Sequence, residues 1–143
     1  MEKKVEMLKG GRAVDDRGEL KFIDNFDFAQ AGIRRFYHTE NHHRGIVRAW
    51  HGHKIEEKYI YVVKGTALFG VVNMEDTTII QKVVLSARDP KMMHIPAGNY
   101  NGFMSLEDDT VVIYYSTLGF DDAVKDDYRE QWDKWNIWHV DYR

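Results

Sequence analysis

Cysteine is absent from the 143-residue sequence. Its absence excludes a disulfide framework, a thiolate nucleophile and any zinc or iron–sulfur site built on cysteine. Long apolar runs are lacking too, because the longest uninterrupted ones are only a few residues and fall far short of a membrane span. The N-terminal segment MEKKVEMLKGGR has no long apolar stretch. We therefore expect no secretory signal and a cytoplasmic protein.

An excess of charge of either sign is also missing. The chain has 20 Lys and Arg against 23 Asp and Glu, so its formal net charge is −3. Such a balance gives no global attraction to nucleic acid or to an anionic membrane, although it is compatible with a small cationic pocket. Aromatic residues make up 13% of the chain, which argues against disorder. The length suits one core, so we expect residues 1–143 to form a single domain.

The apolar pattern is short and mostly two-periodic, which is typical of β-strands. Turn signals such as Asp16-Arg17-Gly18, Lys64-Gly65 and Pro96-Ala97-Gly98-Asn99 separate the apolar stretches. We expect strands at 20–23, 33–38, 46–50, 58–63, 67–73, 77–85, 92–95, 100–105 and 110–116. Many short strands at this spacing predict an all-β sandwich or barrel.

One C-terminal segment has a different period. Val124, Tyr128, Trp132 and Trp135 are spaced four, four and three apart, which places them on one face of a helix over 123–135. An irregular strap over one end of the barrel is the alternative. Residues 136–142 suggest a final strand.

The densest polar cluster surrounds His51 and His53. Side chains two apart on a strand face the same side, so both imidazoles enter the lumen if this strand lines a barrel, with Trp50 and Gly52 facing away. Arg48 has the opposite parity to His51, and a bend or bulge would bring it to the mouth of the barrel. This grouping of basic and acidic side chains favours a functional site over isolated surface histidines.

These residues resemble the cupin superfamily. Gly45-x5-His51-x-His53-x3-Glu57, followed by Gly65, is similar to its first motif, and Pro96-x-Gly98 with Asn101 is similar to its second. The resemblance implies a cupin-type jelly-roll β-barrel with a short C-terminal helix or strap. Metal-binding cupins use a histidine where Asn101 stands, and an amide oxygen is a poor replacement for imidazole on a transition metal. Our main interpretation therefore assigns no metal ligand.

A closer resemblance covers nearly the whole chain, to the dTDP-4-dehydrorhamnose 3,5-epimerase family. The similar segments, in order, are Asp16-Arg17-Gly18, Gly45-Ile-Val-Arg48-Ala-Trp-His51, Glu57-Lys58-Tyr-Ile-Tyr-Val-Val-Lys-Gly65, Ile95-Pro96-Ala-Gly98-Asn-Tyr-Asn101-Gly102-Phe103, Val112-Ile113-Tyr114, and Trp132-Asp133 with Ile137-Trp138. Their order and spacing together carry the resemblance.

The family resemblance implies a role for each matching residue. His51 falls on the general base, Tyr114 on the general acid, and Lys58 on the lysine that steadies the enolate. Arg17 and Arg48 fall on arginines that hold the nucleotide diphosphate or the sugar, and Asn101 falls on a substrate-contacting histidine. We add His53 and His38 as substrate contacts, because each can face a lumen. The resemblance also implies a homodimer paired through N-terminal strands that border the active site.

One family feature has no clear counterpart in this sequence. In the family, a carboxylate orients the catalytic histidine, and without such a partner His51 would be a weaker and less oriented base. The candidates here, which the sequence does not rank, are Asp121, Asp122, Asp126 and Asp127.

The implied reaction is epimerisation at C3 and/or C5 of a nucleotide-linked 4-keto-6-deoxy sugar, in deoxysugar and cell-surface polysaccharide biosynthesis. Imidazole suits the base role because its pKa is about 6.5, and a phenol with a pKa of about 10 can return a proton near neutral pH. An ammonium at Lys58 would stabilise the enolate, and Glu57 or an anionic substrate should help keep it charged. Such proton transfer needs no cofactor.

Two alternatives stay open. Arg48-x-x-His51-x-His53-Lys54 also resembles the nucleotide-sugar 3,4-ketoisomerases, in which two histidines on one face suit proton transfer between neighbouring carbons. A non-catalytic or metal-binding cupin that binds a sugar or a small acid is the alternative from another functional class.

Overall fold

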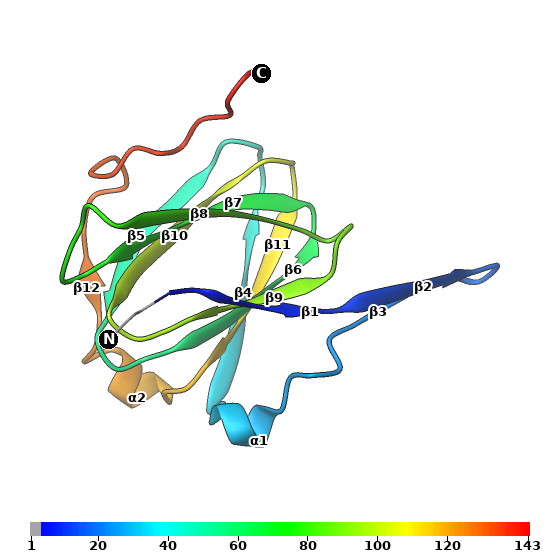
Figure 1. Ribbon diagram of the computed structural model, residues 1–143, viewed down its shortest axis with the longest axis horizontal. Coiled ribbons are helices and arrows are strands. Elements are labelled where there is room, and N and C mark those ends of the chain that lie inside the picture. The colour runs from blue at the N-terminus through cyan, green and yellow to red at the C-terminus, as the bar shows by residue number, and fades with distance from the viewer. Residues whose placement is uncertain (1–3) are drawn as a thin grey trace.

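Two antiparallel five-stranded sheets face each other in the computed structural model, which describes residues 4–143 (Figure 1). The first sheet has the order β1 (Glu6–Lys9), β9 (Lys91–Ile95), β6 (Lys58–Lys64), β11 (Thr110–Ser116) and β4 (Arg35–Asn41). The second has the order β12 (Tyr128–Arg129), β5 (Val47–His53), β10 (Asn99–Ser105), β7 (Thr66–Asn73) and β8 (Ile80–Ser86). The all-β, cupin-type jelly roll expected from the sequence is confirmed.

Each of the nine strands expected between residues 20 and 116 is present, with bounds that differ by up to three residues. Three further strands were not anticipated. These are β1, β12 and β2 (Gly11–Asp15), which forms a separate hairpin with β3 (Gly18–Phe22). All three are short and mostly exposed, so they lack the alternation of buried and exposed side chains that reveals a strand in a sequence.

The main core lies between the two sheets. Burial alternates strictly along β11, where Val112 and Tyr114 face inward while Ile113 and Tyr115 face outward. Phe69 of β7 and Phe103 of β10 meet there, with ring centroids 5.2 Å apart. The other members of this core come from the facing strands and their ends: Ile60, Val62, Ala67, Val71, Leu85, Ala87, Met93 and Ile95.

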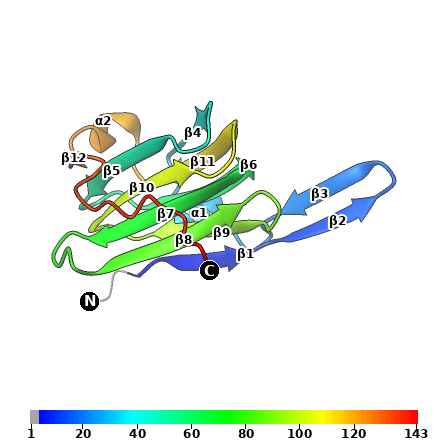
Figure 2. The ribbon, with the colours of Figure 1, turned by 90° about the horizontal axis from the view of Figure 1, so that it is seen from above.

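The C-terminal segment is a strap rather than the expected helix over 123–135. Helix α2 covers only Phe120–Ala123, and the chain then pairs briefly as β12 and runs irregularly over the second sheet (Figure 2). The indole N–H groups of Trp50 and Trp138 both donate to the Trp132 carbonyl, at 3.0 and 2.9 Å. Trp135 packs edge-on against Trp50. These aromatic contacts form a second core on the outer face of the sheet and override the helical spacing.

The final strand expected at 136–142 is also absent, because these residues run irregularly. Trp138 nevertheless reaches the second core and is 9% exposed. The strap therefore gains its order from side-chain packing on the sheet rather than from strand pairing.

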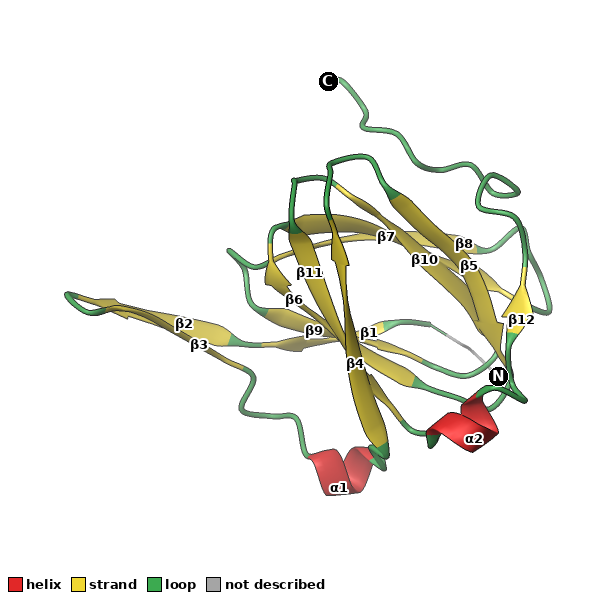
Figure 3. Ribbon diagram, turned by 180° about the vertical axis from the view of Figure 1, so that it is seen from behind, coloured by secondary structure: helices red, strands yellow, loops and turns green. Residues whose placement is uncertain are grey.

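The β2–β3 hairpin extends away from both sheets, as Figures 1 and 3 show. Helix α1 (Phe28–Ala31) follows it and begins where the Asp27 carboxylate accepts the Gln30 N–H at 3.0 Å. Among residues 4–143, no helix has both the length and the apolar character needed to cross a bilayer.

Candidate active site

A cavity of about 640 Å³ opens between the two sheets, bounded on one side by the start of the C-terminal strap. Its lining side chains on strands come from β4, β5, β6, β10 and β11, which belong to both sheets. The sandwich thus brings together side chains that lie far apart in the sequence. Most of the residues expected at the site line this cavity: Arg48, His51, His53, Lys58, Asn101 and Tyr114.

The β5 strand explains how Arg48 and His51 share the cavity despite their opposite parity. Opposite β10, the pairing shifts register, with Asn101 facing His51 and Phe103 facing Arg48. Three residue steps on β5 thus oppose two on β10, and the bulge turns Arg48 to the same side as His51. Of the bend or bulge that the sequence left open as ways to bring Arg48 to the cavity, the structure has the bulge. Trp50, which is fully buried, faces away into the second core, as its alternation with His51 predicts.

His51 is held neutral by its surroundings. Burial lowers its pKa from 6.5 to about 4, and the positive charges of Lys58 and Arg129 add to this effect, while Asp127 opposes it. A neutral imidazole has a free lone pair, so His51 is in the form that accepts a proton.

Lys58 and Tyr114 lie together with Tyr37, which the sequence did not single out as a proton-transfer residue. The rings of Tyr37 and Tyr114 stack with centroids 4.7 Å apart, and the Lys58 ammonium lies 5.6 and 5.5 Å from those centroids. Burial raises the pKa of Tyr114 above its usual value, and Tyr37 adds to the rise. Tyr114 therefore keeps its phenolic proton, as a proton donor requires.

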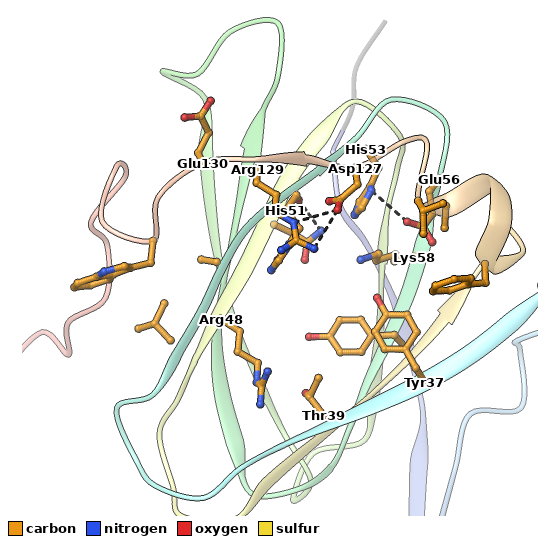
Figure 4. A pocket seen from close by; sticks show the side chains of 18 of the residues that line it. Tyr37, Thr39, Arg48, His51, His53, Glu56, Lys58, Asp127, Arg129 and Glu130 are labelled. Atoms are coloured by element: carbon orange, nitrogen blue, oxygen red, sulfur yellow. Dashed lines mark hydrogen bonds and ion pairs between the residues drawn. The ribbon is translucent and has the colours of Figure 1, made fainter.

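Arg48 and Asn101 are each fixed by a polar contact. The Arg48 Nε donates to the buried Asn41 Oδ1 at 2.6 Å, and the guanidinium lies at the cavity wall (Figure 4). The Asn101 amide donates to the His51 carbonyl at 3.3 Å. Asn101 is 4% exposed, so it supports the backbone of His51 and presents little of its side chain to the cavity.

His53 belongs to a buried polar cluster beside the cavity. Its Nδ1 lies 2.7 Å from the Asp126 carbonyl oxygen and 3.2 Å from the Glu56 carboxylate. The Ser116 hydroxyl donates to Glu56, and Arg35 lies 3.3 Å from the same carboxylate. The sequence did not point to Glu56, because the cupin motif uses the neighbouring Glu57 as its acidic residue.

The structure ranks the four aspartates that were candidates to orient His51. Asp127 lines the cavity, whereas Asp126 turns its carboxylate to the backbone N–H groups of Lys54, Ile55 and Glu56, at 2.7 to 2.9 Å. Asp121 and Asp122 are exposed on α2 and do not line the cavity. Asp127 also pairs with Arg129 at 3.1 Å.

Two expected contacts lie outside the cavity of their own chain. His38 faces the outer side of the first sheet, because its neighbours Tyr37 and Thr39 face inward and side chains alternate along β4. Arg17 lies at the tip of the β2–β3 hairpin, where its side chain is 86% exposed and pairs with Asp15. The hairpin leads Arg17 away from both sheets, so its expected place at this site is wrong for a single chain.

Glu57 does not support Lys58 as expected. Its carboxylate lies 2.5 Å from His94 Nε2, and the His94 ring stacks on Tyr59 on the outer face of the first sheet. Glu57 is therefore separated from His51 and His53, its partners in the metal-binding cupin pattern. Within residues 4–143, no three His, Cys, Asp or Glu side chains gather so that they could hold a metal ion.

The jelly roll with a cavity between its two sheets places the chain among proteins with a cupin-type fold. The family model described as dTDP-4-dehydrorhamnose 3,5-epimerase matches residues 3–138. The chain belongs to this family. No curated protein sequence matches it.

Solved structures of this class share the fold. A dTDP-4-dehydrorhamnose 3,5-epimerase from Bacillus anthracis superposes with a TM-score of 0.79 at 19% identity, covering 96% of this chain and 86% of that one. A 3'-monoepimerase from Streptomyces bikiniensis gives 0.73 at 24% identity, with 87% and 68% covered. A 3,4-ketoisomerase from Helicobacter canadensis gives 0.73 at 14% identity, with 90% and 92% covered.

Proposed function

We propose that the chain epimerises a nucleotide-linked 4-keto-6-deoxy sugar at C3 and/or C5 through an enolate. One observation carries the proposal: His51 of β5 and Tyr114 of β11, from opposite sheets, line one cavity with Lys58. A base on one wall and an acid on the other suit removal of a proton from one face of a carbon and its return to the other.

These three side chains account for every proton and electron pair that moves in the reaction. His51 takes the C–H proton beside the ketone, and the electron pair moves onto the carbonyl oxygen to give the enolate. The Lys58 ammonium stabilises that oxygen. Tyr114 then gives its proton to the opposite face of the carbon, which regenerates the ketone with inverted configuration. Exchange with solvent returns His51 and Tyr114 to their starting forms.

The cavity also suits an anionic nucleotide sugar. Arg35, Arg48, Lys58 and Arg129 contribute positive charge to its wall. A guanidinium matches phosphate oxygens in a bidentate geometry, so we assign Arg48 to the diphosphate or the sugar. Related structures support this ligand class, because the Streptomyces bikiniensis enzyme is described in complex with dTDP-quinovose.

A test is incubation with dTDP- and GDP-4-keto-6-deoxyhexoses in D2O, followed by NMR. We expect deuterium at C3 or C5 together with inversion at that carbon. Absence of exchange with every donor would contradict the proposal and favour a protein that only binds its ligand.

The second candidate function is 3,4-ketoisomerisation, which His53 favours by lining the same cavity as His51. Against it, the His53 ring is held at Nδ1 by the Asp126 carbonyl and is 7% exposed, which leaves it less open to a sugar than His51. In the same NMR experiment, migration of the keto group to C3 would identify the ketoisomerase.

We also propose a homodimer in which the β2–β3 hairpin approaches the partner's cavity. Val14 and Leu20 on the hairpin are 67% and 64% exposed, and Arg17 at its exposed tip would reach a diphosphate there. Light scattering should give twice the chain mass, and Arg17→Ala should raise KM. A monomer with unchanged KM would contradict this arrangement. A cytoplasmic location is part of the proposal and is checked by cell fractionation.

A further inference from the structure

The Lys58 ammonium needs a fixed direction if it is to meet the enolate oxygen. Lys58 is 7% exposed, and within residues 4–143 the ion pairs of the neighbouring carboxylates Glu56 and Glu57 go to other partners. His53 and Glu56 both line the cavity beside Lys58, and the His53 Nδ1 lies 3.2 Å from the Glu56 carboxylate.

The tautomer of His53 follows from its contacts. A carbonyl oxygen only accepts hydrogen bonds, so the 2.7 Å contact with the Asp126 carbonyl places the proton on Nδ1. Burial lowers the pKa of His53, and the charge of Lys58 adds to that effect. The ring is therefore neutral, and its Nε2 carries a lone pair.

The Nε2 atom is the unused end of this ring. It is buried and has no hydrogen-bond partner within residues 4–143. Because Nδ1 is turned to Asp126 and Glu56, Nε2 faces the other way, toward the cavity that His53 and Lys58 both line. Figure 4 shows Lys58 beside His53 and Glu56, with its amine directed into the cavity.

Lys58 is the donor that suits this acceptor. Its ammonium rests over the rings of Tyr37 and Tyr114 at the end of a flexible four-carbon stem, so a change of rotamer moves it without moving β6. A buried acceptor without a partner and an ammonium in the same cavity are complementary. A hydrogen bond between them removes the free-energy penalty of leaving the buried Nε2 without a donor.

We propose that His53 is a positioning residue whose Nε2 accepts a hydrogen bond from the Lys58 ammonium during the reaction, linking it to Glu56 and aiming it at the enolate oxygen. The role rests on the proposed epimerase function. It replaces the expected substrate contact for His53.

The cluster behind His53 is built to stay in place. The Glu56 carboxylate is held by Ser116 and Arg35, and the Glu56 backbone N–H donates to the Asp126 carboxylate at 2.7 Å. Glu56 is 2% exposed. These contacts fix the carboxylate and the carbonyl that orient the His53 ring.

Two substitutions of His53 distinguish its contact with Asp126 through Nδ1 from its proposed hydrogen bond to Lys58 through Nε2. His53→Asn keeps an N–H near the Nδ1 position but removes the group that faces Lys58. His53→Gln places an amide oxygen near the Nε2 position. We expect His53→Asn to slow deuterium uptake roughly ten- to hundred-fold with little change in KM, and His53→Gln to retain most of the rate. The opposite order would overturn the proposal and leave His53 as an anchor for Asp126.

A matched pair of glutamates gives the control. Glu56→Gln should slow uptake, whereas Glu57→Gln, the same change on the neighbouring outward-facing residue, should not. Equal effects of the two variants would count against the link through His53. Circular dichroism establishes that each variant folds.

A measurement without turnover keeps the two proposals distinguishable. In ¹⁵N NMR of the labelled full chain saturated with a dTDP-sugar that lacks the 4-keto group, we expect a neutral His53 with its proton on Nδ1 and an Nε2 resonance shifted from that of the free chain toward that of a hydrogen-bonded acceptor. Lys58→Met should abolish this shift. A proton on Nε2, or a shift retained in Lys58→Met, would overturn the positioning role. The expected spectra without any sugar turnover would instead contradict only the epimerase function.

Discussion

The two faces of the first sheet carry similar side chains but different chemistry. The same strands place Lys58 and Tyr114 on the inner face and Tyr59 and Tyr115 on the outer face. Inside, burial raises the pKa of Tyr114 and the second sheet brings His51 opposite. Outside, Tyr115 packs among phenylalanines from earlier in the chain. Enclosure by the second sheet, more than residue type, makes the inner face a site.

The charges divide in the same way. The large cavity is lined by four cationic side chains, Arg35, Arg48, Lys58 and Arg129, and by three carboxylates, Glu56, Asp127 and Glu130, so the cationic groups are in excess. A smaller cavity of about 240 Å³ on the outer face is lined by Glu6 and Asp27, and by no lysine or arginine among the described residues. Of these two cavities, the inner one therefore suits a nucleotide diphosphate.

The largest expected effect comes from replacing His51 in the inner cavity, and His94 on the outer face serves as the control. His51→Asn should reduce deuterium uptake by roughly 10²- to 10⁴-fold, because it removes the base. His94→Asn, on the outer face, should leave uptake near the wild-type rate. NMR in D2O measures both. Retained uptake in His51→Asn would remove His51 from the base role.

A smaller effect is expected from the paired tyrosines. Tyr114→Phe should slow inversion roughly 100-fold while deuterium still enters on the face of His51, because only the donor is lost. Tyr115→Phe should change neither rate. Chiral analysis of the product together with NMR separates exchange from inversion. Normal inversion in Tyr114→Phe would show that another group returns the proton.

The smallest effect concerns stability and pH. Because the pKa of His51 is about 4 in the folded chain and about 6.5 when unfolded, the unfolded chain binds more protons between these values. The contribution of His51 to the free energy of unfolding is complete above pH 6.5 and is lost as the pH falls toward 4. Thermal melts should show a Tm drop of a few degrees, reduced in His51→Gln. An equal drop in the variant would contradict the assignment.

Much of the site follows from local sequence pattern. The two-residue period of β5 predicted that His51 and His53 share a side, and the opposite parity of Arg48 indicated that a bend or a bulge would be needed to bring it there. The same rule placed His38 wrongly, because the sequence does not say which parity of β4 faces inward. Tyr37 and Thr39 took that side.

Other features depended on contacts between distant residues. The helical spacing over 123–135 gave way to indole hydrogen bonds and packing on Trp50. Glu56 and Glu57 are neighbours in sequence, yet one is buried beside His53 and the other pairs with His94. No local pattern distinguishes them, because the difference arises from which sheet face each residue meets.

The sequence by itself determined the nine strands β3 to β11, their alternation and the family, since these depend on short-range periodicity and motif order. Only the tertiary structure decided which carboxylate accompanies His53, where Arg17 lies and how the strap runs. Those outcomes depend on long-range packing, in which burial and the partners across the cavity set the charge state of each group.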